Sequence, residues 1–370
     1  MKKICILVPS LAGGGAEKVA VNLANFYADM GFHVDLVVFM FRGQYLDLVQ
    51  SDVHVCNLNV SRTRYAIPGI ARYLRRNKPD YLISAIRDSN IFVGLSLMVT
   101  PSFNGRVVFR EANTLHGMQL FSWYRRLLFR GLMKLCYRKA NFIIANSHDT
   151  RQALIESSIA NSDKVLVIPN PVVPNNVSAL ALEEIIEPWF QESGLKIVLG
   201  VGRLHEQKNF GLLIQAFSFV YKKVNEARLV IIGEGQEEAT LRRQIEALGL
   251  EGVAKILPFK KNVYPYFKNA AVFVLTSKWE GFGNVLVDAL AVGTPVVSAD
   301  CPGGPRMILD GGRYGCLVPD LDPSSFSKAI LEVLSKPDQV ADNRADCIER
   351  SKLYSIPEVS RQYLAVVSGA

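Results

Sequence analysis

The sequence predicts an α/β protein made of two consecutive, doubly wound domains that face a central cleft. Its 370 residues correspond to about two domains at 100 to 200 residues each. Short apolar runs alternate with amphipathic stretches through nearly the whole chain, which is typical of buried parallel strands separated by helices. The alternation breaks at 169–176 (PNPVVPNN), where closely spaced prolines exclude a continuing strand or helix.

The predicted strands fall into one series on each side of this break. The first series is 4–8, 34–40, 81–86, 106–109 and 141–145, and the second is 196–201, 228–232, 253–257, 271–275 and 295–299. The predicted organisation is an N-terminal domain (1–172), a linker (173–195), a C-terminal domain (196–353) and a terminal helix in 354–370. That helix either packs on its own domain or crosses back to the first. Ligands of such sheets bind beyond the carboxyl ends of the strands.

Charge is distributed unevenly along the chain. The net charge of +8 combines 21 basic and 11 acidic residues in 1–180 with 21 basic and 23 acidic residues in 181–370. The first domain is therefore expected to meet an anionic ligand or surface, and membrane headgroups or nucleic acid are the ordinary candidates. Nucleic acid is disfavoured because no reader motif is present.

The sequence also indicates where the protein works. The six cysteines are single, with no CxxC pair and no zinc spacing, which favours a reducing compartment. The first apolar run has only strand length, so no signal peptide is expected, and no run approaches the roughly 18 residues that cross a bilayer. We expect a cytoplasmic protein, soluble or peripheral to a membrane.

A glycine-rich turn follows the first strand. Gly14 and Gly15 precede a helical stretch, where backbone amides favour an anion, although a tight structural turn is an equal alternative. The motif is not GxGxxG, and the second strand ends Phe39-Met40-Phe41 without an acid. A dinucleotide-dependent oxidoreductase is therefore excluded.

Three loops of the second half carry candidate chemistry. Arg203 and Lys208 lie at a strand-to-helix junction and could neutralise a leaving diphosphate, although a solvated loop is the alternative. Glu280 and Asp288 follow the strand 271–275, where carboxylates suit sugar hydroxyls and helix-start amides suit phosphate. The glycine-rich turn 300–306 ends the next strand. We expect these loops and the first-domain glycine turn to converge on the cleft.

These motifs resemble those of the retaining glycosyltransferases of family 4, which have the GT-B fold of two Rossmann-like domains. Five segments carry the likeness, over nearly the whole chain: 13–24 (GGGAEKVAVNLA), 201–210 (VGRLHEQKNF), 233–237 (GEGQE), 277–297 (SKWEGFGNVLVDALAVGTPVV) and 299–319 (ADCPGGPRMILDGGRYGCLVP).

The resemblance implies roles for individual residues. It assigns Gly14, Gly15, Arg203 and Lys208 to the donor diphosphate, Glu280 to the donor sugar and Asp288 to the ribose. The donor-binding set further includes Gly281, Phe282, Gly283, Asn284 and Val285. The catalytic candidates are Glu280, Lys208, Arg203 and Glu111. The resemblance points to front-face attack without a protein nucleophile, with UDP as the most frequent nucleotide and with neither a metal nor another cofactor.

The chain departs from the family pattern at three positions. Asp288 is one methylene shorter than the usual Glu, and Met307 replaces another Glu. Ala112 stands where relatives have a donor-contacting His, so Glu111 or Asn113 is expected to serve instead. Asp320-Leu321-Asp322 matches a metal-binding pattern, but Asp322 followed by Pro323 fits a helix N-cap better.

The acceptor side is expected in the basic half of the chain. Arg126, Arg130, Lys134 and Arg138 recur every four residues and predict a basic helical stripe, with Phe129, Met133 and Tyr137 beside it. The stripe is either a solvated face or a contact with a membrane or a polyprenyl diphosphate. His116 is the candidate acceptor base, with an ordinary surface histidine as the alternative.

The predicted function is therefore retaining transfer of a hexose or N-acetylhexosamine, from a nucleotide diphosphate sugar to a membrane-associated saccharide in surface glycan biosynthesis. The enzyme would work at the inner face of the cytoplasmic membrane. The alternative is an inactive nucleotide-sugar-binding or scaffold subunit of a glycan assembly complex. Asp288 and Met307 favour this alternative, whereas Glu280, Arg203 and Lys208 oppose it.

Overall fold

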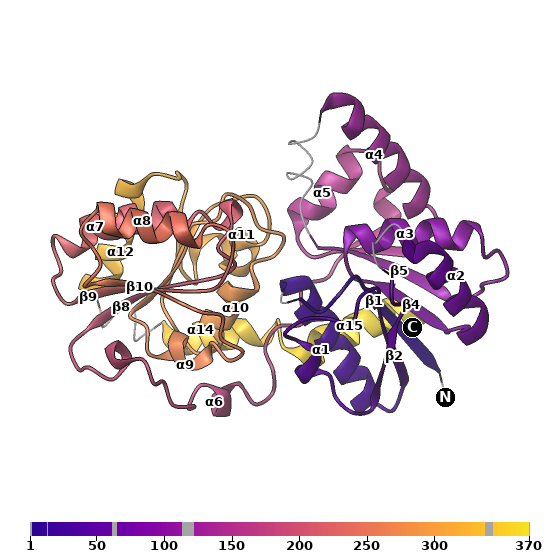
Figure 1. Cartoon of the computed structure of the whole chain (residues 1–370), viewed down its shortest axis with the longest axis horizontal. Helices are drawn as coiled ribbons and strands as arrows, with labels where there is room; N and C mark the ends of the chain where they lie inside the picture. Colours follow the sequence, from indigo (N-terminus) through magenta and orange to yellow (C-terminus); the bar gives the residue numbers. More distant parts are fainter. Residues whose placement is uncertain (1, 13, 61–64, 113–121, 337–342, 370) are drawn as a thin grey trace. The chain divides into compact units, whose positions relative to one another are not determined.

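The computed structural model describes residues 2–12, 14–60, 65–112, 122–336 and 343–369. The chain divides into two compact units, Met1–Val172 with Ile356–Ala370, and Val173–Ser355 (Figure 1). Each unit is a parallel sheet covered by helices on both faces, so the expected pair of doubly wound α/β domains is present. No helix in the described part of the chain is long and apolar enough to cross a membrane.

The first unit has a seven-stranded parallel sheet in the order β3-β2-β1-β4-β5-β6-β7. Its strands are β1 (Lys3–Val8), β2 (His33–Val38), β3 (Val53–Asn57), β4 (Tyr81–Ser84), β5 (Arg106–Glu111), β6 (Phe142–Ala145) and β7 (Val165–Val167). Two of these strands, β3 and β7, are absent from the sequence prediction. The strand order reverses at β1, so β1 ends at the topological switch point where open sheets bind ligands.

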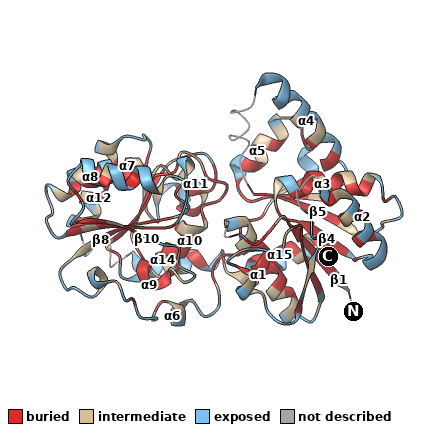
Figure 2. Ribbon diagram, viewed as in Figure 1, coloured by how far each residue is buried: buried red, intermediate tan, exposed pale blue. Residues whose placement is uncertain are grey.

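Helices cover the two faces of this sheet in separate groups. The helices α2 (Ala66–Asn77), α3 (Arg87–Met98), α4 (Trp123–Tyr137) and α5 (His148–Glu156) share one buried apolar cluster. The helix α1 (Gly15–Asp29) contacts α15 (Ile356–Ser368), which also contacts β4 and β5. Figure 2 shows the strands buried and much of the outer surface of α4 exposed.

Helix α15 is held in the first unit by buried polar contacts as well as by apolar packing. Arg110 is fully buried in β5, and its Nε donates to Tyr363 Oη of α15 at 3.2 Å. The same guanidinium donates to Ala85 O at 2.9 Å and to Asn170 Oδ1 at 2.6 Å. Tyr27 Oη of α1 donates to Ser360 O at 3.1 Å. The last helix of the chain thus completes the domain that begins it.

The second unit has a six-stranded parallel sheet in the order β10-β9-β8-β11-β12-β13. Its strands are β8 (Lys196–Val201), β9 (Ala227–Ile232), β10 (Ala254–Leu257), β11 (Val272–Leu275), β12 (Val296–Ala299) and β13 (Cys316–Val318). Its helices are α6 (Val177–Leu180), α7 (Phe210–Tyr221), α8 (Glu238–Ala247), α9 (Tyr264–Lys268), α10 (Asn284–Ala291), α11 (Pro305–Ile308), α12 (Pro323–Ser335) and α14 (Arg344–Lys352). Here the order reverses between β8 and β11.

A buried carboxylate organises one edge of the first sheet. Asp35 of β2 has a side chain 1% exposed, with Lys3 Nζ 2.8 Å from Oδ2 and His54 Nδ1 3.1 Å from Oδ1. Tyr73 Oη of α2 also donates to Oδ2. Burial alone would raise the pKa of Asp35, but the donors Lys3, Tyr73 and His54 together hold that pKa below its ordinary value.

This depressed pKa predicts an acid-dependent loss of stability. Asp35 stabilises the fold fully above the unfolded-state pKa of about 4, and this contribution disappears as the pH falls through the lower folded-state pKa. We expect Asp35→Asn to lower the free energy of unfolding by about 1 kcal/mol or more at pH 5. The difference from wild type in urea unfolding should shrink at pH 3.

The exposed Asp52 serves as the matched control, and Asp52→Asn should change the free energy of unfolding little at either pH. An Asp35→Asn deficit as large at pH 3 as at pH 5 would contradict the ionised role of Asp35.

Candidate active site

The candidate site of the second unit lies where three adjacent strands end. The neighbours β8, β11 and β12 end at Val201, Leu275 and Ala299, and the loop after each strand carries one of the predicted motifs. Because β8 and β11 flank the switch point, their following helices diverge and leave the two loops free to meet. The sequence prediction that these loops converge is confirmed within this unit.

Hydrogen bonds tie the β8 and β11 loops together. Lys208 ends a 3₁₀ turn, Glu206–Lys208, and its carbonyl accepts from Thr276 Oγ1 at 3.0 Å. Lys278 N donates to Gln207 O at 2.8 Å, and Gln207 Nε2 donates to Trp279 O at 2.8 Å. These contacts fix the backbone on both sides of the candidate catalytic side chains.

An ion pair joins the two main candidates. Lys208 Nζ lies 2.6 Å from Glu280 Oε1, and the two side chains are 14% and 7% exposed. Ser277 Oγ donates to the same Oε1 at 2.6 Å. Ser277 opens the motif segment 277–297 but was given no role, and its place three residues before Glu280 was the signal that could have found it. One carboxylate oxygen thus receives both a cation and a hydroxyl in a largely desolvated setting.

Glycines let the β12 loop approach this carboxylate. Glu280 N donates to Pro302 O at 2.9 Å, and Gly303 has a φ of +127°. A Cβ on Gly303 would lie 2.1 Å from Glu280 O, and one on Gly304 would lie 2.0 Å from Phe282 O. Side chains at these positions would collide with backbone, so the glycines are required for the close packing of the two loops.

The loop after β11 continues into α10, which begins at Asn284. Gly283 adopts a φ of +98° before it, and the predicted residues Gly281 to Val285 form the entrance to the helix. Phe282 is buried and packs edge-on against Tyr354, with ring centroids 5.6 Å apart. The helix therefore starts four residues after Glu280, at the end of the same loop.

Asp288 lies in α10 and is 3% exposed. Its Oδ1 accepts from Tyr264 Oη of α9 at 2.7 Å. Burial, followed by the neighbouring Asp288 carboxylate, raises the pKa of Tyr264 well above its ordinary value, so the phenol remains a donor. Tyr264 was not singled out in the sequence because a lone tyrosine 24 residues from its partner gives no pattern.

The remaining residues of the β8 and β12 loops are either exposed or in contact with neighbours within the second unit. Arg203 is exposed on the β8 loop. Arg306 pairs with Asp300 across the β12 turn, and Met307 O accepts from Arg350 Nη2 at 2.7 Å. Cys301 is buried beside the ion pair, and desolvation, followed by the Glu280 charge, raises the pKa of its thiol to about 12. That thiol stays protonated at neutral pH.

The described residues contain no set of side chains that could bind a metal ion. Asp322 Oδ2 accepts from Ser325 N at 2.9 Å, so the predicted N-cap of α12 is confirmed. Among the residues placed by the structure, no group of three or more His, Cys, Asp or Glu side chains could hold an ion.

In the first unit, the glycine turn forms the start of α1. Gly14 is the N-cap and Gly15 the first helical residue. A Cβ on Gly14 would lie 2.2 Å from Glu17 Oε2, so the Glu17 carboxylate folds over the helix N-terminus. Sequence reasoning did not single out Glu17.

Glu111 ends β5 and is fully buried. Arg87 donates to it through Nη2 at 3.0 Å and Nε at 3.3 Å, and Tyr137 Oη donates to Oε2 at 2.6 Å. Asn90 Nδ2 extends the network to Tyr137 Oη at 3.1 Å. Glu111 is thus engaged through both oxygens. The two other candidates predicted in the first unit, Asn113 as a donor contact and His116 as acceptor base, lie outside the described residues.

The predicted basic stripe of α4 is only partly exposed. Arg126 and Arg130 are half-buried, and Arg130 Nη2 donates to Ser157 O at 3.0 Å, whereas Lys134 and Arg138 are exposed. The expected neighbours Met133 and Tyr137 belong to the core. An unpredicted set of apolar side chains is exposed instead: Trp123, Tyr124, Leu127, Leu128 and Leu135.

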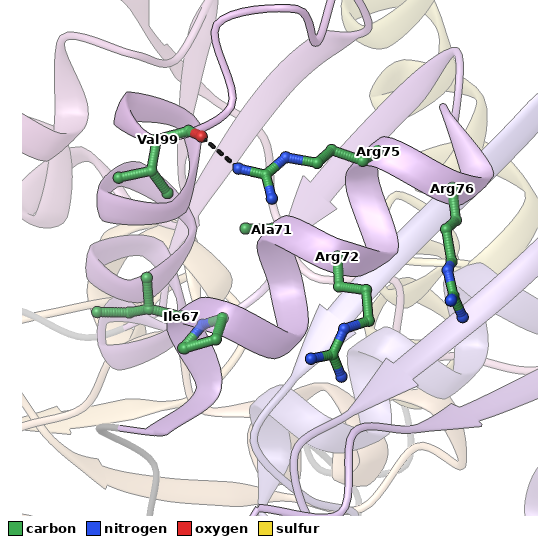
Figure 3. Close-up of a pocket in the computed structure, with 7 residues that line it drawn as sticks. Ile67, Ala71, Arg72, Arg75, Arg76 and Val99 are labelled. Carbon is green, nitrogen blue, oxygen red and sulfur yellow. Dashed lines mark hydrogen bonds between the residues drawn. The ribbon is translucent and has the colours of Figure 1, made fainter.

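A second basic surface lies along α2. A shallow groove of about 530 Å³ has an apolar part formed by Ile67, Pro68, Ala71 and Val99, and a basic part formed by Arg72, Arg75 and Arg76 (Figure 3). Arg75 Nη2 donates to Val99 O at 2.7 Å at the end of α3. Because none of the described residues that line this groove is acidic, the groove complements an anion.

Comparison with known proteins agrees with these features. The model of the group 1 glycosyl transferases matches residues 183–354, and that of glycosyltransferase family 4 matches residues 13–176. The N-acetylgalactosamine-N,N'-diacetylbacillosaminyl-diphospho-undecaprenol 4-alpha-N-acetylgalactosaminyltransferase of Campylobacter jejuni is 27% identical over 100% of both chains. The lipopolysaccharide core biosynthesis glycosyltransferase LpsE of Rhizobium meliloti is 26% identical, over 94% of this chain and 93% of its own.

Solved structures share the architecture. Anabaena HepE, crystallised with UDP-glucose, superposes with a TM-score of 0.83 at 21% identity over 100% of both chains. WaaG, a glycosyltransferase involved in lipopolysaccharide biosynthesis, gives 0.78 at 14% identity, over 99% of this chain and 100% of its own. The motifs, the two Rossmann-like domains and both family models agree: the chain belongs to the glycosyltransferases of the family 4 type, with the GT-B fold.

Proposed function

We propose that this glycosyltransferase moves a hexose or N-acetylhexosamine from a nucleotide diphosphate sugar, with UDP as the favoured nucleotide, to a lipid-linked saccharide in surface glycan biosynthesis. The observation that carries the proposal is the Lys208–Glu280 pair at the switch point, where a cation for phosphate and an acceptor for hydroxyls lie side by side. Relatives whose names include diphospho-undecaprenol and lipopolysaccharide core biosynthesis support the acceptor class.

The chemistry follows from charge development in the transition state. As the anomeric bond breaks, negative charge grows on the leaving diphosphate, and Lys208, Arg203 and the amides at the start of α10 stabilise it. Glu280 binds the sugar hydroxyls. We propose retention by front-face attack, in which the departing phosphate oxygen helps remove the acceptor proton. Two cations then supply the charge neutralisation, so no metal ion is required.

The first unit is proposed to serve the acceptor. Gly14 and Gly15 are the exception, since we keep their assignment to the donor diphosphate, through the amides at the start of α1. Glu111 was predicted as catalytic, but action as a base would require Arg87 and Tyr137 to release it. We therefore propose that Glu111 orders the end of β5, beside the residues that bind the acceptor.

The alternative, an inactive nucleotide-sugar-binding subunit, is favoured by one observation. Tyr264 occupies one oxygen of Asp288, the residue assigned to the ribose. Both alternatives bind a nucleotide sugar, and only the enzyme turns it over.

A thermal-shift screen against a panel of nucleotide sugars tests the donor proposal. A ligand that binds only the folded state raises the melting temperature by mass action, and we expect at least one UDP-sugar to do so. Product analysis with that donor and a lipid-linked saccharide should then show transfer with retention. No shift with any nucleotide sugar would contradict donor binding, and a shift without turnover would favour the inactive subunit.

Lys208→Ala should lower turnover by about 10² or more, because it removes a cation from the developing diphosphate charge. The assay is run in excess EDTA, where wild-type activity should persist. Lys278→Ala is the control, since Lys278 pairs with exposed Glu206 in the neighbouring loop. Near-normal turnover by Lys208→Ala would count against the assignment.

We further propose that α4 contacts the inner face of the cytoplasmic membrane. Trp123 and Leu128 are 77% and 72% exposed, and Lys134 on the same helix and Arg138 at its C-cap are also exposed. Aromatic and apolar side chains next to cations suit the boundary between anionic headgroups and acyl chains. The Arg72, Arg75 and Arg76 groove adds positive charge to the same domain.

Leu128→Glu should reduce sedimentation with liposomes that contain anionic phospholipid at low salt, because it places a negative charge at the apolar contact. The matched control is Leu182→Glu, since Leu182 is equally exposed at 72% but belongs to the second unit. Failure of the wild-type protein to sediment, or equal loss in both variants, would contradict the α4 contact.

A further inference from the structure

The Lys208–Glu280 ion pair is largely buried, and its acceptor oxygen also accepts a hydrogen bond from a third group. Lys208 Nζ and Ser277 Oγ both lie 2.6 Å from Glu280 Oε1. The Glu280 side chain is only 7% exposed, so its charge is compensated mainly by these two donors. Removing one partner of such a pair is costly because it leaves a desolvated charge behind.

The proposed function gives each residue of this pair a ligand to bind, and the inference rests on that proposal. Lys208 binds the diphosphate and Glu280 binds the sugar. A phosphate that draws Lys208 away therefore deprives Glu280 of its counter-charge and places new negative charge nearby. Ser277 alone then remains on Oε1. Binding of phosphate to Lys208 is thus coupled to binding of the sugar by Glu280.

An intact nucleotide sugar compensates Glu280 for the loss of Lys208 in two ways. The nucleoside diphosphate that remains after transfer does so in neither way. The sugar hydroxyls of the donor can donate to Glu280 in place of Lys208. The glycosylated phosphate also carries less charge than a free terminal phosphate, which loses a second proton with a pKa of about 6. Free nucleoside diphosphate therefore presents more negative charge to Glu280, and it lacks the transferred sugar whose hydroxyls would donate to Glu280.

We infer that Glu280 discriminates the intact nucleotide sugar from the released nucleoside diphosphate, so that the Lys208–Glu280 pair re-forms after transfer and expels the product. The selectivity comes from repulsion of the wrong ligand as well as attraction of the right one. Ser277 is the positioning residue that keeps Glu280 in place while Lys208 is engaged by phosphate.

The same pair of loops contains a natural comparison. Lys278 Nζ lies 2.7 Å from Glu206 Oε1, but these side chains are 36% and 64% exposed. Water compensates either charge when this pair opens, so its loss should cost little. Glu206→Gln therefore makes the same change of charge in the same loops without the buried acid.

The test is calorimetric titration of wild type, Glu280→Gln and Glu206→Gln with two ligands. One is the nucleotide sugar selected by the thermal-shift panel, and the other is its nucleoside diphosphate, UDP for a UDP-sugar. We expect Glu280→Gln to bind UDP about tenfold tighter than wild type, while donor affinity stays equal or falls. Glu206→Gln should change neither Kd more than about twofold.

A disrupted site weakens binding, so tighter binding of UDP by Glu280→Gln cannot come from misfolding. Ser277→Ala should change UDP affinity in the opposite direction. Because Glu280 then depends on Lys208 alone, UDP should bind more weakly than it does to wild type. Equal changes for both ligands in Glu280→Gln, or weaker binding of UDP, would overturn the inference and leave donor binding intact. A wild-type protein that binds no nucleotide would overturn the proposed function and this inference together.

Discussion

The site depends on one topological constraint of the second sheet. Because β8 and β11 are neighbours whose following helices diverge, residues 72 positions apart in the sequence meet beyond the sheet. A lysine and a glutamate are paired there, largely shielded from solvent. Polar contacts between the two loops and the glycines of the β12 turn hold them in place. Both side chains are thus held beyond the ends of β8 and β11 before any ligand arrives.

The first unit applies buried polar groups differently. Arg110, Glu111 and Asp35 are among its most buried side chains, and each bonds to groups on several elements. These networks fix strand ends and attach α15. The positive charge of the domain is presented elsewhere, on the exposed surfaces of α2 and α4. Interior charges therefore specify the fold, whereas surface charges remain available for partners.

Much of the fold could be predicted from the sequence because strands buried on both faces appear as short apolar runs. Three strands were missed for physical reasons: β3 carries His54 and Cys56 at an edge position, and β7 and β13 have only three residues each. Lys208 and Glu280 were found because strand ends carry ligands. Tyr264 and Ser277 were missed because their importance comes from three-dimensional contact. On α4, the spacing of the basic residues predicted that they share one face of a helix. It did not predict that packing would partly bury this face.

The most direct test of the account is a crystal structure with an intact nucleotide sugar bound. Lys208 Nζ should have left Glu280 Oε1 for a diphosphate oxygen, while a hydroxyl of the sugar donates to Glu280 and Ser277 keeps its hydrogen bond. A complex in which Lys208 and Glu280 remain paired, with the nucleotide sugar bound away from the ends of β8 and β11, would contradict it.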